Sequence, residues 1–130
     1  MNKNKILLVE DDAILAKTIY DELVESGFEV DQAHDGEEGL RMVGEKKPNL
    51  VLLDILMPKK NGFEVLQGIK ENPDTKDIPV IMLTVLGADE DVETTMLGAS
   101  DYLVKSEYTP SQIVEKVKAF FAKQQASESK

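Results

Sequence analysis

Residues able to do chemistry follow four separate apolar runs of the chain. In chain order they are Glu10, Asp11 and Asp12 after the first run, Asp54 at the end of the next, Thr84 after a third and Lys105 after the last. An unpaired charge inside an apolar strand costs several kcal/mol. Asp54 is therefore expected at the end of its strand, where solvent, a cation or a substrate can meet it.

Together these residue types suit phosphoryl transfer. Carboxylates crowded at one place repel one another unless protons or a cation offset them. Oxygen ligands without Cys or His select a hard cation, and we expect Mg²⁺. The hydroxyl of Thr84 and the ammonium of Lys105 could hold the oxygens of a phosphoryl group. The pattern predicts metal-assisted phosphoryl transfer with Asp54 as the nucleophile, although each residue alone is weak evidence.

The elements that must position these residues are predicted as five strands alternating with five helices. Apolar runs indicate strands at residues 5–9, 28–33, 78–84 and 100–105, and one that starts at Leu50 and is stopped by Pro58. Helices are predicted after Asp12, from Asp35, Asn61 and Thr109, and weakly from Ala88 to Leu97. This alternation favours an α/β fold, a mostly parallel sheet with helices on both faces, whose strand ends share one edge.

Capping residues mark several helix ends. Asn61 is followed three positions later by Glu64, which is a capping-box pattern, and Thr109–Gln112 combines an N-cap residue, proline and glutamine in the same way. Asn61 and Gly62 could also form a hairpin turn, but no alternating strand follows them. Gly27 is placed to end the first helix.

Composition limits the class of protein. The 130 residues suit one domain, and the net charge of −10 disfavours direct binding to nucleic acid. There is no cysteine, which excludes disulfides and thiolate metal sites. The apolar runs are far shorter than the roughly 18 residues of a membrane span. We expect a cytoplasmic protein that does not enter a membrane.

The chain resembles a response-regulator receiver domain, CheY-like, of two-component signalling. The matching segments are Ile6–Asp12, Asp54–Pro58 with Gly62 after it, Thr84, and Gly98–Lys105. The resemblance covers nearly the whole chain and implies a flavodoxin-like sheet of strand order 2-1-3-4-5, the order known from CheY itself. We assign residues 1–124 to the receiver domain and 125–130 to a polar C-terminal tail, expected to be frayed.

The resemblance also implies roles for the site residues. Asp54 resembles the phospho-acceptor and Lys105 the lysine that pairs with the phosphoryl group. Asp11 resembles the direct Mg²⁺ ligand, Glu10 the acid that acts through a metal-bound water, and Leu56 the residue whose backbone carbonyl completes the ligand set.

Further roles concern signalling. Thr84 and Tyr102 resemble the switch pair, a hydroxyl that moves to the phosphate and a ring that turns inward behind it. Asp12 is expected to cap a helix or to support the metal ligands. The implied partners are a sensor histidine kinase or phosphotransfer protein and a downstream protein target. The implied chemistry is self-catalysed transfer to Asp54 and hydrolysis from it, without the separate substrate of an enzyme.

An alternative is a pseudo-receiver, a protein-interaction module that does not use aspartyl phosphate. Val85 favours it, because the family usually has a small residue there. Ser106 also favours it, because it replaces a proline that usually follows a cis bond; without proline a cis bond costs roughly 2.5–4 kcal/mol, so a trans bond is expected. Leu56 and Leu86 stand where many members carry polar side chains near the attacking water. A phosphatase is a weaker third possibility, since no second acid is evident for a leaving group.

Overall fold

The computed structural model describes residues 4–55, 61–84 and 99–128. Its strands are β1 (Lys5–Val9), β2 (Glu29–Ala33), β3 (Leu50–Asp54), β4 (Val80–Thr84) and β5 (Asp101–Val104). Its helices are α1 (Ala13–Glu25), α2 (Gly36–Lys46), α3 (Gly62–Glu71), the short 3-10 helix η1 (Lys105–Glu107) and α5 (Pro110–Glu128). The helix predicted from Ala88 to Leu97 lies outside the described residues.

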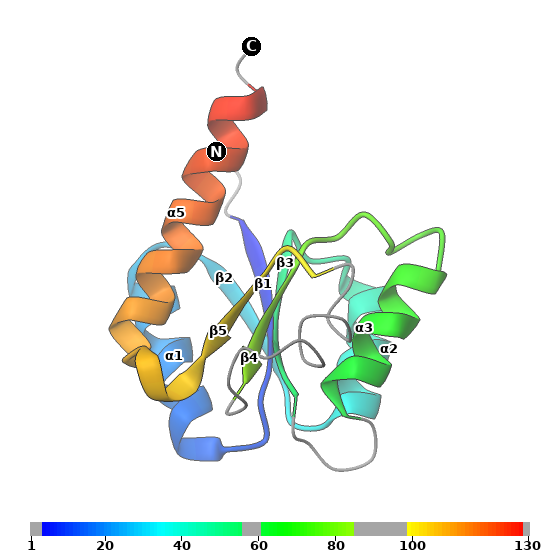
Figure 1. Cartoon of the computed structure of the whole chain (residues 1–130), viewed down its shortest axis with the longest axis horizontal. Helices are drawn as coiled ribbons and strands as arrows, with labels where there is room; N and C mark the ends of the chain where they lie inside the picture. The colour runs from blue at the N-terminus through cyan, green and yellow to red at the C-terminus, as the bar shows by residue number, and fades with distance from the viewer. Residues whose placement is uncertain (1–3, 56–60, 85–98, 129–130) are drawn as a thin grey trace.

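The strands form one parallel sheet in the order β2-β1-β3-β4-β5. Every neighbouring pair is parallel, with Ile6 opposite Leu50, Val51 opposite Val80, and Met82 opposite Tyr102. The predicted α/β fold and strand order are therefore confirmed. All carboxyl ends of the strands lie at one edge, at the bottom of the view in Figure 1.

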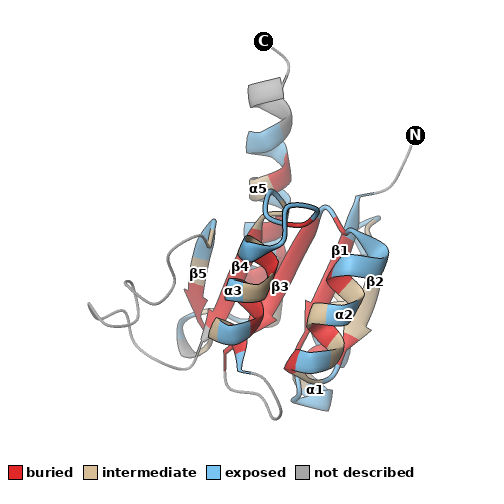
Figure 2. Ribbon diagram, turned by 90° about the vertical axis from the view of Figure 1, so that its right-hand side faces the viewer, coloured by how far each residue is buried: buried red, intermediate tan, exposed pale blue. Residues whose placement is uncertain are grey.

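Helices cover both faces of the sheet, with α1 and α5 on one face and α2 and α3 on the other (Figure 1). Successive side chains of a strand point to opposite faces. Accordingly, Ile6 and Leu8 of β1 belong to the core under α1 and α5, whereas Leu7 and Val9 belong to the core under α2 and α3. Strand β3 is buried throughout, as Figure 2 shows, which explains its continuous apolar run.

Helix termini follow the capping signals of the sequence. Asn61 and Glu64 form the predicted capping box at α3, and Thr109 and Gln112 exchange hydrogen bonds of 2.9 and 3.2 Å at α5. Gly27 follows α1 with φ of +99°, a left-handed conformation that glycine adopts at no steric cost. These helix termini are thus specified by the local sequence.

Some predicted boundaries were wrong. Strand β4 begins at Val80 and not at Ile78, because Pro79 has no N–H for a ladder hydrogen bond. Helix α5 continues to Glu128, so residues 125–128, which were assigned to the polar C-terminal tail, are helical. Figure 1 shows this helix reaching well past the sheet. Within the parts of the chain that the structure describes, no helix has the length and apolar character of a membrane span.

Candidate functional site

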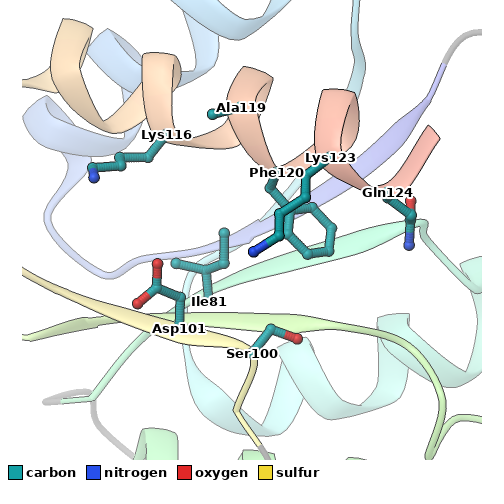
Figure 3. Close-up of a pocket in the computed structure, with 8 residues that line it drawn as sticks. All are labelled: Ile81, Ser100, Asp101, Lys116, Ala119, Phe120, Lys123 and Gln124. Carbon is teal, nitrogen blue, oxygen red and sulfur yellow. The ribbon is translucent and has the colours of Figure 1, made fainter. Parts of the chain in front are cut away.

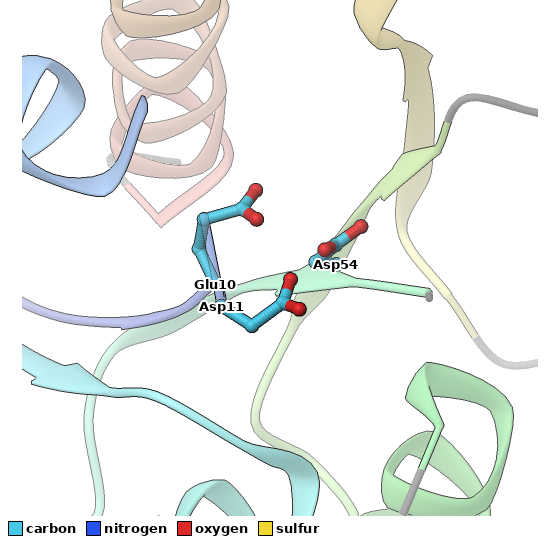
Figure 4. Close-up of side chains that lie close together, drawn as sticks. All are labelled: Glu10, Asp11 and Asp54. Carbon is cyan, nitrogen blue, oxygen red and sulfur yellow. The ribbon is translucent and has the colours of Figure 1, made fainter. Parts of the chain in front are cut away.

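Three carboxylates meet at the carboxyl ends of β1 and β3. Val9 and Leu53 are opposite each other in register, so the residues that follow them reach the same point of the sheet edge. One carboxylate oxygen from each of Glu10, Asp11 and Asp54 lies within 4.8 Å of the other two, and Figure 4 shows the side chains converging. Glu10 and Asp54 are only 0% and 3% exposed, whereas Asp11 is exposed to solvent.

Lys105 reaches this cluster from the end of β5. Its Nζ lies 2.7 Å from Oε1 of Glu10 and 3.0 Å from Oδ1 of Asp54. The side chain is 16% exposed, so the ammonium is largely removed from water and its two ion pairs replace hydration. The strand order separates β5 from β3 by β4, and the long lysine side chain spans that distance along the sheet edge.

The pKa of Asp54 is raised from its ordinary value of 3.8 to about 7. Burial is the largest cause, and the hydrogen bond and negative charge of Glu10 add to it, while Lys105 acts in the opposite direction. Burial also acts to lower the pKa of Lys105, but Glu10 and Asp54 outweigh burial and the pKa lies above its ordinary value. At neutral pH Asp54 is thus poised between its protonated and ionised forms, beside a lysine that stays charged.

Asp12 contacts Glu10 through its backbone and caps helix α1 with its side chain. Its backbone N–H donates to Oε2 of Glu10 over 3.1 Å, and its own carboxylate accepts from the N–H groups of Ile14 and Leu15, both over 3.1 Å. The predicted N-cap role of Asp12 is confirmed. Glu10 therefore has a fixed orientation, with one oxygen on Asp12 and the other on Lys105.

The three carboxylates fit a metal ion by donor type and arrangement. They supply only oxygen ligands, the set that hard divalent cations prefer. One ammonium compensates one of three carboxylate charges, so the cluster carries excess negative charge that a cation or protons must offset. Asp11 is open to solvent and gives an ion a route of entry, while Glu10 and Asp54 form the buried side.

For the other predicted site residues, the structure describes only some positions. Leu56, Val85 and Leu86 lie outside the described residues, as does the side chain of Thr84, whose backbone ends β4. Tyr102 is half-buried on β5 and packs against the core under α2 and α3, two positions before the strand end. No peptide bond of the described residues is cis, so the Lys105–Ser106 bond is trans, as predicted.

Two features of the site were not predicted. One is the 2.7 Å ion pair between Lys105 and Glu10, since the resemblance implies a pairing of Lys105 with the phosphoryl group alone. The other is Gly62, for which the resemblance implies no role, yet which packs against the backbone of Asp54. Glycine at the first position of a helix is a weak signal for such close packing.

Comparison with known proteins agrees with this geometry. The family model "Response regulator receiver domain" matches residues 6–118. The transcriptional regulatory protein CpxR of Escherichia coli strain K12 is 40% identical over 126 residues, which cover 96% of this chain and 52% of CpxR. The chain spans about half the length of the curated relatives it matches.

Solved structures give the same result. A CheY-like response regulator receiver domain protein from Methanospirillum hungatei JF-1 has a TM-score of 0.83 and 29% identity, covering 97% of this chain and 99% of that one. The Mn²⁺-bound form of the response regulator Rcp1 has a TM-score of 0.76 and 34% identity, covering 91% and 94%. Because the family model spans most of the chain and a relative at 40% identity aligns with nearly all of it, this chain belongs to the response regulator receiver domains, the phosphorylation-dependent signalling switches of two-component systems.

Proposed function

We propose that Asp54 is the phospho-acceptor of this switch and that Mg²⁺ binds at Glu10, Asp11 and Asp54, with the backbone carbonyl of Leu56 as a further ligand. The observation that carries the proposal is the position of Asp54, 3.0 Å from the Lys105 ammonium and within 4.8 Å of two further carboxylates. The structural relative Rcp1 was solved in an Mn²⁺-bound form, which supports the binding of a divalent cation by this chain. The phosphoryl donor is a sensor histidine kinase, a phosphotransfer protein or a small phosphodonor, acting in the cytoplasm.

The chemistry follows from the charges around Asp54. A carboxylate oxygen of Asp54 forms a bond to phosphorus while the bond from phosphorus to the donor breaks, and the leaving group keeps the electron pair. A bound Mg²⁺ supplies positive charge that offsets the carboxylates and the phosphoryl oxygens. The Lys105 ammonium, already 3.0 Å from Oδ1 of Asp54, can donate to an oxygen of the group that becomes attached there. Glu10 keeps that ammonium in place from the other side.

The change at Asp54 is proposed to reach a protein target through Thr84, Tyr102 and a face formed by β5, α5 and the helix predicted at Ala88–Leu97, which lies outside the described residues. A hollow of about 430 Å³ lies on this face (Figure 3). It is lined by Ile81, Ser100, Asp101, Lys116, Ala119, Phe120, Lys123 and Gln124. Its apolar floor and two lysines suit a protein surface that offers apolar and acidic side chains. With a net charge of −10, the chain itself is proposed to make no direct contact with nucleic acid.

Intact-mass analysis after incubation with acetyl phosphate and Mg²⁺ tests the proposal. One added phosphoryl group is expected in the wild type, and none in Asp54→Asn or in EDTA. Asp21→Asn is the matched control, because Asp21 is a solvent-exposed carboxylate of α1 that pairs with Lys17 and should leave the modification unchanged. Modification that persists in Asp54→Asn would refute the assignment, and a wild type that is never modified would favour the pseudo-receiver.

A further inference from the structure

Gly62 stands directly against the backbone of the phospho-accepting residue. It is the first residue of α3 and is buried. A Cβ atom at this position would lie 2.4 Å from the carbonyl oxygen of Asp54 and 2.7 Å from Cα of Ile55. Its φ is not in the left-handed region, where Gly27 alone among the glycines of the described residues lies. Gly62 is therefore required for space and not for backbone freedom.

Two other glycines, in the helices α2 and α3 that cover the same face of the sheet, show how the contact at Gly62 differs. A Cβ at Gly68, further along α3, would meet Cδ1 and Cδ2 of Leu40 at 2.9 Å, which are the flexible end of a side chain. A Cβ at Gly44 in α2 would meet no atom within 4 Å. Only at Gly62 of these three does the obstacle consist of backbone, and that backbone belongs to Asp54 and Ile55.

Neither β3 nor α3 can easily move away from this contact. Strand β3 lies between β1 and β4, and the N–H of Ile55 donates to Leu83 over 3.1 Å. Helix α3 is held by its capping box at Asn61 and by buried side chains further along, and the N–H of Gly62 donates to the carbonyl of Ile55 over 2.7 Å. Ordinary contact begins at 3.4 Å, so a methyl group 2.4 Å from the Asp54 oxygen requires a shift of about 1 Å.

We propose that Gly62 is a positioning residue for Asp54. Because it lacks a side chain, α3 can pack close enough to keep the Asp54 carboxylate 3.0 Å from Lys105 and beside Glu10 and Asp11. A shift of about 1 Å is a third of the 3.0 Å that separates Nζ of Lys105 from Oδ1 of Asp54. Misplacement by that amount typically costs about 100-fold in rate, and disturbing the groups that orient metal ligands costs about 10- to 100-fold in metal affinity. This inference rests on the proposed function for both the cation site and the phosphorylation of Asp54, and the two are measured separately so that either can fail alone.

The test compares three glycine-to-alanine variants with the wild type. Mn²⁺ affinity is measured by water proton relaxation, and the phosphorylation rate by acetyl phosphate under single-turnover conditions. The Mn²⁺ affinity and the phosphorylation rate are both determined under conditions in which urea titrations show that each variant is fully folded. Gly62→Ala is expected to bind Mn²⁺ about 10-fold or more weakly and to be phosphorylated about 30- to 100-fold more slowly. Gly68→Ala and Gly44→Ala should stay within about twofold of the wild type in both measurements. Asn61→Ala, which removes the cap of the same helix without adding atoms near Asp54, should lower stability but change neither value per folded molecule.

Two results obtained with folded variants would overturn the proposal. One is a folded Gly62→Ala with wild-type Mn²⁺ affinity; the other is a Gly68→Ala that loses as much affinity, which would mean that α3 packing in general is responsible. If Gly62→Ala does not fold in buffer, the measurements are repeated in a Gly44→Ala background with trimethylamine oxide, which favours the folded state. Failure to fold there as well would show that Gly62 serves the fold and not the site. A wild type that binds Mn²⁺ but is not phosphorylated would count against the proposed function and leave the affinity comparison valid.

Discussion

Replacing Asp54 by asparagine should stabilise the protein at high pH and leave its stability at low pH nearly unchanged. Asparagine has almost the shape of a protonated aspartic acid but cannot ionise. In the folded wild type the pKa of Asp54 is about 7, against 3.8 ordinarily, so the folded state binds this proton more tightly than the unfolded chain does. The stability that Asp54 contributes is therefore complete below pH about 4 and is lost as the pH rises through about 7.

The size of the effect follows from the same two values. One pKa unit corresponds to about 1.4 kcal/mol, and linkage between pH 5 and pH 8.5 gives a loss of about 3 kcal/mol in the wild type that the variant does not suffer. Lys105 does not cancel this gain, because its Nζ keeps Glu10 as a partner at 2.7 Å. At m-values of about 1–3 kcal/mol per molar urea, the difference corresponds to a midpoint shift of roughly 1–3 M.

Urea titrations of both proteins at pH 5 and pH 8.5 without divalent cations provide the assay. The other carboxylates are common to the two proteins. The change with pH in the difference between their free energies of unfolding therefore reports on Asp54 alone. Asp21→Asn serves as the control and should change stability by less than about 1 kcal/mol at either pH, because its ion pair with Lys17 is exposed. If the advantage of Asp54→Asn were equal at pH 5 and pH 8.5, the burial and Glu10 arguments for a raised pKa would be refuted.

Three further predictions concern the cation, the switch and the phosphoryl lifetime. At pH 8.5, Mg²⁺ at 100 times its Kd should raise the wild-type free energy of unfolding by about 2.7 kcal/mol and that of Asp54→Asn by much less; equal gains would exclude Asp54 as a ligand. Hydrogen exchange with and without beryllium fluoride and Mg²⁺ should differ most across residues 85–106, and changes confined to α1 would contradict the proposed output face. Leu56→Asn with Leu86→Glu should speed loss of phosphate by roughly one to two decades, since apolar side chains cannot orient a water, and an unchanged decay rate would show that another feature sets the lifetime.

Much of the fold could be predicted because its determinants are local. The continuous apolar run at Leu50–Leu53 indicated a strand buried on both faces, and β3 is such a strand. The capping box at Asn61 and the N-cap at Asp12 are contacts between residues at most three positions apart, so the sequence itself specifies them. The meeting of Glu10 and Asp54 followed from one rule, that parallel strands end at the same edge.

What could not be predicted depends on distances between elements far apart in the chain. The ion pair of Lys105 with Glu10 requires a side chain to span from β5 along the sheet edge, and no spacing in the sequence encodes that reach. The packing of Gly62 against Asp54 depends on how closely α3 approaches β3. The raised pKa of Asp54 depends on complete burial of its strand, which an apolar run suggests without giving its degree.

The charge balance of the site explains why burial and signalling belong together. Three carboxylates against one ammonium leave two excess negative charges, and a proton on Asp54, whose pKa is raised first by burial and then by Glu10, reduces this excess to one. A divalent cation in place of the proton would bring the site to neutrality and free Asp54 to act as a nucleophile. A phosphoryl group on Asp54 would then restore one excess negative charge beside a buried strand. Such a charge requires a new hydrogen-bond donor. We propose that this donor is the hydroxyl of Thr84, which follows Leu83 at the end of β4. We propose that a hydrogen bond from this hydroxyl would couple the added charge at Asp54 to the neighbouring strand ends.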